Sequence, residues 1–199
     1  LEEFGAQVAV NGGFFKPYRA ESPWNYYPHS GDPVNVIGVA ISGGATYSTG
    51  PTELPPLCGC DTGAVIQRGG CPNETDWALA GNVLLVENGV ARVDAPDPAK
   101  SIRSPRTAVG VDASGERLWL VVVDGRQDGY SEGVTIPELA RILAELGADE
   151  AINLDGGGSA TLAAAEPDGA RVLNAPFHTR VPMRERPVAN HLGVFASPR

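Results

Sequence analysis

The chain has 199 residues, a length that suits one domain of ordinary size. Hydrophobic residues are 42% of the chain and charged residues 20%, so a core can be buried and intrinsic disorder is excluded. With 15 Lys and Arg against 24 Asp and Glu, the net charge is −9, which argues against a nucleic acid partner because phosphate neutralisation needs a basic face. No apolar run approaches the roughly 18 residues of a membrane span, so none is expected.

Periodicity in the first half of the chain predicts short strands joined by loops. Residues 7–10 form an apolar strand that runs into Asn11-Gly12-Gly13-Phe14-Phe15, and residues 34–41 form a second. Gly and Pro cluster around three cysteines in residues 42–76, which predicts a loop insertion there.

The second half contains clearer local signals. Asn88-Gly89 predicts a hairpin between residues 83–86 and 90–93, and a second hairpin joins residues 107–111 to 118–123. Thr135 and Glu138 form a capping box with Pro137 in the first turn, so a helix begins there and ends at Gly147. Residues 151–154 and 190–195 complete the strands. The prediction is one α+β domain over residues 1–199, rich in strands, with one principal helix and long loops.

Cys58, Cys60 and Cys71 are the only cysteines in the chain. Three is an odd number, so one disulfide and one further thiol are expected. Cys58 and Cys60 are too close to pair, which leaves Cys58–Cys71 or Cys60–Cys71. A zinc site would need four closing ligands, and no His lies nearby. A disulfide favours an exported protein.

Four polar clusters stand where predicted strands begin or end. They are Asn11-Gly12-Gly13, Arg106-Thr107, Asp124-Gly125-Arg126-Gln127 with Ser131-Glu132-Gly133, and Asn153-Leu154-Asp155-Gly156-Gly157-Gly158-Ser159. Taken singly, Asn or Asp before Gly is an ordinary turn residue, and an Arg is often part of a structural ion pair. Together they indicate a site, because strand ends are held by the sheet yet remain open to ligands.

The glycine run after Asp155 is the most informative cluster. Three successive residues without side chains let backbone N–H groups approach an anion closely, and a carboxylate beside that anion makes sense as a reacting group. The segment is no P-loop, since no Lys follows it, and Ser159 is not in a Gly-x-Ser-x-Gly elbow. His191 is the one histidine considered for a site, whereas His29 and His178 are expected to be ordinary loop residues.

The ordered set of these segments closely resembles the phosphodiester glycosidase family, from about Ala6 to Phe195. Residues 153–161 are its most specific part, and Ser131-Glu132 resembles the bacterial branch. The resemblance implies hydrolysis of a sugar 1-phosphodiester on a glycan or cell-wall component. Family domains carry strands before the Asn-Gly-Gly-Phe-Phe segment, and only ten residues precede Asn11 here, so N-terminal strands are expected to be missing.

The chemistry of this reaction assigns roles to the candidate residues. A departing phosphate is a good leaving group, so its charge must be stabilised, and a carboxylate must lie near the anomeric carbon. Asp155 is the first choice for that carboxylate. Glu132 is expected to be the second catalytic carboxylate, and Asp124 is the alternative candidate. Arg106 or Arg126 is expected to lower the pKa of Asp155 and so keep it ionised near neutral pH. The predicted binding residues are Asn11, Gly12, Arg106, Thr107, Arg126, Asn153, Gly156, Gly157, Gly158 and Ser159.

Two other functions are compatible with the same residues. One is a phosphodiesterase that breaks the P–O bond of a cell-wall polymer, and the other is a non-catalytic module that binds glycan or phosphate. The expected partner is a carbohydrate phosphodiester, with no metal and no cofactor required. A secreted or extracytoplasmic location is expected, and the oligomeric state is left open.

Overall fold

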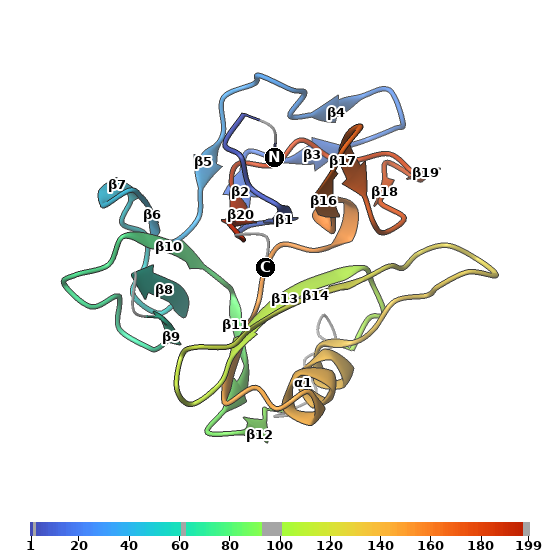
Figure 1. The fold of residues 1–199 in the computed structure, drawn as a ribbon. Coiled ribbons are helices and arrows are strands. Elements are labelled where there is room, and N and C mark those ends of the chain that lie inside the picture. The colour runs from blue at the N-terminus through green and yellow to red at the C-terminus, as the bar shows by residue number, and fades with distance from the viewer. Residues whose placement is uncertain (2, 61–62, 93–100, 197–199) are drawn as a thin grey trace.

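The computed structural model describes residues 1, 3–60, 63–92 and 101–196. Figure 1 shows a fold dominated by strands with one helix, so the predicted α+β class is confirmed. Most strands belong to three sheets, whose neighbouring strands all pair antiparallel.

The central sheet has the strand order β12-β11-β15-β13-β14. Its strands are β11 (Val83–Glu87), β12 (Val90–Ala91), β13 (Arg106–Val111), β14 (Leu118–Val123) and β15 (Glu150–Asn153). Both predicted hairpins are confirmed. Asn88 and Gly89 both have positive φ, as a two-residue hairpin turn requires. Val93, the last residue of the predicted strand 90–93, lies outside the described residues.

Helix α1 (Ile136–Glu145) covers one face of this sheet. The capping box is confirmed, since the Thr135 hydroxyl accepts from the Glu138 amide and the Glu138 carboxylate accepts from the Thr135 amide. Leu139 and Leu143 are fully buried against the sheet. In the described part of the chain, no helix has the length and apolar character needed to cross a bilayer.

A second sheet packs on the other face, with the order β7-β6-β10-β8-β9. It consists of β6 (Ala40–Ser42), β7 (Ala45–Ser48), β8 (Pro56–Cys60), β9 (Gly63–Ile66) and β10 (Trp77–Ala80). Leu57 is fully buried and packs with Val109 and Ile152 of the central sheet. The prediction that residues 42–76 form a loop insertion is therefore wrong for β7, β8 and β9.

That prediction took glycine residues as a sign of loops, but one glycine in this sheet is needed for close packing between strands. A Cβ at Gly59 would lie 1.9 Å from the Trp77 ring, so only glycine fits in strand β8 there. The predicted strand 34–41 is likewise divided into β5 (Asn35–Val36) and β6, because Gly38 between them has φ +96°. Of the two disulfides considered, Cys58–Cys71 is the one that forms.

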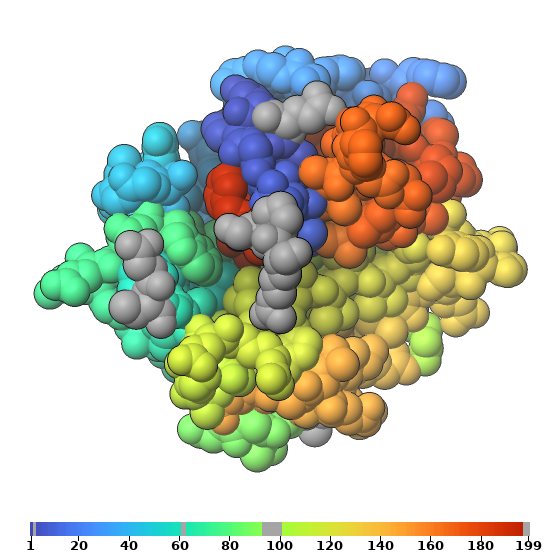
Figure 2. Space-filling model, in the orientation of Figure 1, coloured from blue at the N-terminus to red at the C-terminus, as the bar shows by residue number. Residues whose placement is uncertain are grey.

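The third sheet brings together strands from both ends of the chain, in the order β17-β16-β1-β20. Its strands are β1 (Val8–Asn11), β16 (Leu162–Glu166), β17 (Gly169–Val172) and β20 (His191–Val194). Figure 2 shows the blue residues of β1 directly beside the orange residues of β16 and β17.

Short paired segments surround this sheet, and sequence patterns did not predict most of them. They are β2 (Phe15–Lys16), β3 (Arg19–Ala20), β4 (Tyr26–Tyr27), β18 (Phe177–His178), β19 (Val181–Pro182) and the 3₁₀ turn Gly157–Ser159. β2 pairs with β5, β3 with β4, and β18 with β19. Strands of two residues are too short to show a period.

Candidate active site

Asp155 lies just beyond the end of β15, where the central sheet meets the third sheet. Its side chain is 13% exposed, and its Oδ2 accepts a 2.6 Å hydrogen bond from the Ser159 hydroxyl. Arg186 Nη2 lies 3.2 Å from the same oxygen and also donates to the Gly156 carbonyl at 2.9 Å. Arg186 Nε donates to Ser159 Oγ at 2.8 Å. Asp155, Ser159 and Arg186 thus form one bonded group.

Burial has the largest effect on the pKa of Asp155. It raises the pKa of this carboxyl above its ordinary value, and Arg186, the Ser159 hydroxyl and the Gly156 amide offset only part of that rise. The expectation that arginines keep this pKa low is therefore corrected, because desolvation is the largest effect. The cation in contact is also Arg186, whereas Arg106 and Arg126 were expected.

Close packing explains the glycine run that follows Asp155. A Cβ at Gly156 would lie 2.7 Å from the Pro105 carbonyl oxygen, and a Cβ at Gly158 would lie 2.8 Å from His178 Nδ1. Gly157 has φ +59°, and its amide donates to the Pro105 carbonyl at 2.8 Å. The Ser159 amide donates to the Gly156 carbonyl at 3.1 Å. The Gly157 and Ser159 amides, which were expected to bind an anion, thus already donate hydrogen bonds to carbonyls of the protein.

Two further arginines lie near this turn, Arg126 with its guanidinium and Arg106 with its backbone. Arg126 Nη1 is 3.1 Å from the Cβ position of Gly157, and the Arg106 Cα is 3.4 Å from that of Gly156. Burial, followed by the charge of Arg126, lowers the pKa of Arg106 below its ordinary value. Arg106 donates to the carbonyls of Val134 and Ile102. The guanidinium groups of Arg186 and Arg126 therefore lie at the Gly156–Ser159 turn, whereas Arg106 approaches it with its backbone.

Asn11 joins the two sheets behind Asp155. Its Nδ2 donates to the Asp155 carbonyl at 2.6 Å, and its Oδ1 accepts from Thr107 Oγ1 at 2.7 Å and from the Thr161 amide at 3.2 Å. The Gly12 carbonyl accepts from the Asp155 amide at 3.2 Å. These contacts hold Asp155 in place, and contact of Asn11, Gly12 or Thr107 with a sugar stays a prediction.

Asn153 is also buried, in the last position of β15. Its Nδ2 donates to Asn82 Oδ1 at 2.8 Å, while its Oδ1 has no hydrogen-bond partner among the described residues. A buried carbonyl oxygen without a partner is costly, so it marks a place where a water or ligand donor would be stabilising.

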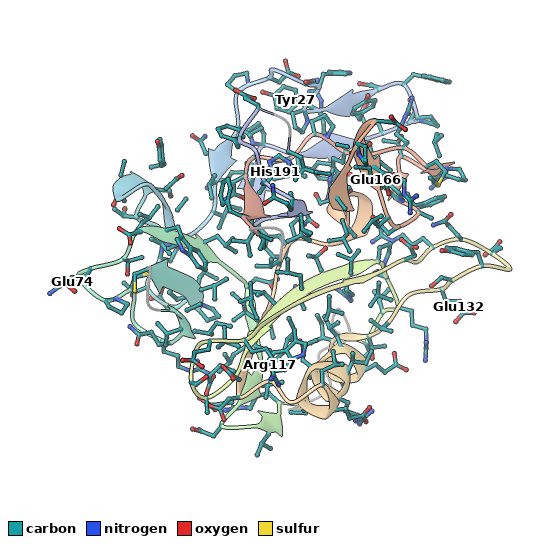
Figure 3. The ribbon with its side chains drawn as sticks, viewed as in Figure 1. Tyr27, Glu74, Arg117, Glu132, Glu166 and His191 are labelled. Atoms are coloured by element: carbon teal, nitrogen blue, oxygen red, sulfur yellow. A yellow bond between two sulfur atoms is a disulfide. The ribbon has the colours of Figure 1, made fainter. Side chains whose placement is uncertain are left out.

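The other two candidate carboxylates occupy different surroundings. Asp124 accepts hydrogen bonds from the Tyr130 hydroxyl, the Asn174 amide group and the Ala175 backbone amide, so it orders the loop around itself. The Glu132 side chain is 82% exposed and lies 3.9 Å from Arg103 Nε. Figure 3 shows it at the outer edge of the molecule, pointing away from the body of the protein. The structure thus gathers Asp155 with the arginines and leaves Glu132 outside that group.

Two site residues were missed by the sequence prediction, Arg186 and His178. Arg186 sits in an irregular segment with no motif, and only the folded chain brings it to Asp155. His178 was expected to be a loop residue, yet it belongs to β18 and is 1% exposed, with its ring against Gly158 and the edge of Tyr26. Burial and the charges of Arg186 and Arg184 lower its pKa to about 4.

A cavity of about 260 Å³ opens beside the bonded group. Ser159 and Arg186 border it, together with Asn11, Thr161, Glu185 and His191. Leu1, Val188 and apolar residues of β1, β16 and β17 complete its lining. Burial lowers the pKa of His191. A sugar ring in this cavity would lie beside Ser159 and Arg186, the two residues bonded to Asp155.

Comparison with known proteins identifies one family. The family model described as phosphodiester glycosidase matches residues 4–195. N-acetylglucosamine-1-phosphodiester alpha-N-acetylglucosaminidase of Bos taurus is 30% identical over 179 residues, and that of Mus musculus is 28% identical over 176 residues. Each alignment covers 79% of this chain but only 31% of the relative, so the chain spans about a third of the length of these proteins.

Solved structures share the fold. The catalytic domain of the zebrafish N-acetylglucosamine-1-phosphodiester alpha-N-acetylglucosaminidase, in a form auto-inhibited by its pro-peptide, aligns with a TM-score of 0.67 at 24% identity. The alignment covers 97% of this chain and 64% of that one. A putative exported protein from Burkholderia pseudomallei aligns with a TM-score of 0.64 at 18% identity, covering 98% and 66%.

Proposed function

The chain belongs to the phosphodiester glycosidase family, and from this premise we propose that it hydrolyses a sugar 1-phosphodiester at the glycosidic C–O bond. The products would be the free sugar and a phosphomonoester. One observation carries the proposal: a buried carboxylate, Asp155, is bonded to Arg186 beside a turn that the Arg126 guanidinium also approaches. This arrangement suits a reaction in which positive charge develops on the sugar while negative charge develops on the departing phosphate.

We assign phosphate binding to Arg126 and Arg186, supported by their positions beside Gly157 and Gly156. An arginine fork matches two phosphate oxygens, and its charge stabilises the anion that leaves. Arg106 lies close by but donates to backbone carbonyls, so its proposed part is to add positive charge to the turn.

Asp155 would act in its ionised form at the anomeric carbon. The contacts from Ser159 and Arg186 both go to Oδ2, and we assign Oδ1 to the sugar. The carboxylate stabilises the oxocarbenium ion while the C–O bond breaks, and water then adds to the sugar carbon. For Glu132 to be the second carboxylate, the loop that carries it must move inward when substrate binds.

An isotope experiment separates this function from its alternatives. Diesters of N-acetylglucosamine 1-phosphate are the first substrates to test, because the relatives are named for that group. In ¹⁸O-labelled water, C–O cleavage places the label in the sugar, whereas P–O cleavage places it in the phosphate. Binding without turnover would support the non-catalytic module.

The matched variants are Asp155→Asn and Asp112→Asn. Asp155→Asn keeps the side-chain shape and removes the charge, so we expect turnover to fall by about a hundredfold or more while substrate still binds. Asp112 lies in the exposed turn after β13 and should tolerate the change. An Asp155→Asn variant at wild-type rate would refute the assignment.

An extracytoplasmic location is part of the same proposal. The Cys58–Cys71 disulfide supports it, because such bonds persist in oxidising compartments. The glycan or polymer that carries the diester is also a proposal, and the labelled-water assay on defined diesters is its first test.

A further inference from the structure

Arg126 holds a backbone conformation that its own side chain does not favour. Its φ is +59°, in the left-handed region, where residues other than Gly, Asn and Asp are seldom found. Its guanidinium nevertheless reaches the turn after Asp155, with Nη1 3.1 Å from the Cβ position of Gly157 and Nη2 donating to Ser104 Oγ at 3.3 Å. Contacts outside this residue must therefore keep its backbone in place.

The segment Asn174-Ala175, between β17 and β18, binds the chain on both sides of Arg126. Two residues before Arg126, the carboxylate of Asp124 accepts from the side-chain amide at position 174 at 2.9 Å and from the backbone amide at position 175 at 3.0 Å. One residue after it, Gln127 Nε2 donates to the Ala175 carbonyl at 2.9 Å. One short segment thus fixes the backbone of Arg126 from both ends.

Asn174 also bonds to the chain that follows the 3₁₀ turn. Its Oδ1 accepts from the Leu162 amide at 2.9 Å. Its Nδ2 donates to the Ala160 carbonyl at 2.9 Å as well as to Asp124. Both N–H groups of the side-chain amide and its oxygen are therefore engaged. This one side chain joins the loop that carries Arg126 to the chain directly after the turn.

We propose that Asn174 is a positioning residue that holds the Arg126 guanidinium at the place where it meets the phosphate. This inference rests on the proposed function, in which Arg126 binds that phosphate. The hydrogen bond from Arg126 to Ser104 is long, at 3.3 Å, so the direction of the side chain depends mainly on the backbone conformation. Without Asn174, the backbone at position 126 is free to relax to a negative φ, which turns the guanidinium away from Gly157.

Binding of inorganic phosphate, measured by calorimetry, tests the inference without turnover. Asn174→Ala should weaken phosphate binding and lower kcat/KM on a diester of N-acetylglucosamine 1-phosphate, each by about tenfold, because a misplaced guanidinium loses about one charge-assisted hydrogen bond. The acid limb of the kcat/KM profile should stay in place, since Arg186 and not Arg126 contacts Asp155 Oδ2. A wild-type phosphate affinity in Asn174→Ala would overturn the positioning role.

A double-mutant cycle separates positioning from a general loss of structure. If Asn174 acts through Arg126, the double variant Asn174→Ala/Arg126→Ala should bind phosphate no more weakly than Arg126→Ala alone. A merely structural role predicts two independent losses that multiply in the double variant, and that result would overturn the inference. An Arg126→Ala variant with wild-type phosphate affinity would overturn both the positioning role and the assignment of Arg126 to the phosphate.

Two further variants complete the experiment. Gln127→Ala removes the second contact to Ala175 and leaves every bond of Asn174 in place, so it tests the same segment if Asn174→Ala does not fold. It should weaken phosphate binding about threefold and have no effect once the arginine is removed. Gln67→Ala is the matched control, because its side-chain amide also donates to a backbone carbonyl, that of Gly70 at 2.7 Å, but lies directly after β9 in the second sheet.

The experiment distinguishes failure of this inference from failure of the proposed function. Coupling between Asn174 and Arg126 in phosphate binding, without hydrolysis of any diester, would refute the proposed function and keep the positioning role. Hydrolysis of a diester together with independent losses in the cycle would refute the positioning role alone. Equal losses of phosphate affinity in Gln67→Ala and Asn174→Ala would also refute it, since the first variant lies outside the site.

Discussion

Arg186 is the residue whose charge most directly controls Asp155. Its guanidinium lowers the pKa of the Asp155 carboxyl, against the larger effect of burial. If Arg186→Gln removes this charge, the pKa rises further, and the ionised form is lost at a higher pH. We therefore expect the acid limb of the kcat/KM profile to move to higher pH in Arg186→Gln, with partial restoration in Arg186→Lys.

The pH profile distinguishes two parts that Arg186 could play. A rate loss with an unmoved acid limb would mean that Arg186 acts on the phosphate alone and not through Asp155. The Lys variant is the control for folding, since it retains the charge but lacks the fork that contacts both Ser159 and Asp155.

At this scale, the sequence identified Asp155 but not its environment. The glycine run after Asp155 is a local pattern, and it is visible without a fold. The contact with Arg186 spans 31 positions and depends on how an irregular segment returns to the sheet. The direction of the Asp155 pKa shift depends on burial, which composition does not specify. The prediction that arginines would dominate failed for that reason.

At the scale of secondary-structure elements, strand β8 is a core strand that a disulfide bonds to a segment outside it. Cys58 lies in β8, next to the fully buried Leu57, and is bonded to Cys71, 13 positions away. Loss of a bridge that closes a loop of this length costs about 3 kcal/mol through the entropy of the unfolded chain.

We expect Cys71→Ser to lower the free energy of unfolding by about 2–3 kcal/mol in urea, with kcat unchanged under conditions where the variant is folded. Cys60→Ser, which keeps the bridge, is the control. A folded Cys71→Ser variant with a large loss of kcat would show that β8 also positions the active site.

Elements with strong local chemistry were predictable, and those defined by partners were not. The capping box at Thr135 and the Asn88-Gly89 turn specify their own geometry within a few residues. Strand β8 contains Gly59, and glycine alone suggests a loop. Only the folded structure shows that the Trp77 ring occupies the space where a side chain at position 59 would lie. The two-residue strands β3 and β4 exist only through their pairing.

At the scale of the whole molecule, the Asn11 side chain links the third sheet to the central sheet through hydrogen bonds. Its amide group donates to the Asp155 carbonyl, and its carbonyl oxygen accepts from the Thr107 hydroxyl and from the Thr161 backbone amide. Asn11→Ala leaves several buried groups without partners, so we expect the free energy of unfolding to fall by about 2–4 kcal/mol.

Thr107→Val, which removes one hydroxyl, should cost about 1 kcal/mol in the same urea titration. If both variants keep wild-type stability and Asn11→Ala loses only substrate affinity, Asn11 contacts the sugar and does not link the two sheets. The sequence predicted that Asn11 and Asp155 would meet, because both follow strands, but it did not predict which of their atoms would do so.

The pairing of the chain's two ends has a consequence for the order in which the protein acquires its function. Strand β1 pairs with β16 and with β20, and the Asn11 contact with Asp155 spans 144 positions. During synthesis, β1 cannot form its pairings until β16 (Leu162–Glu166) and β20 (His191–Val194) have been made. Such distant pairings make folding slow, in the range of milliseconds to seconds for domains rich in them. Arg186 is made later than Asp155 and Ser159, so a nascent chain is inert until Arg186 has been added and the segment that carries it has returned to the sheet.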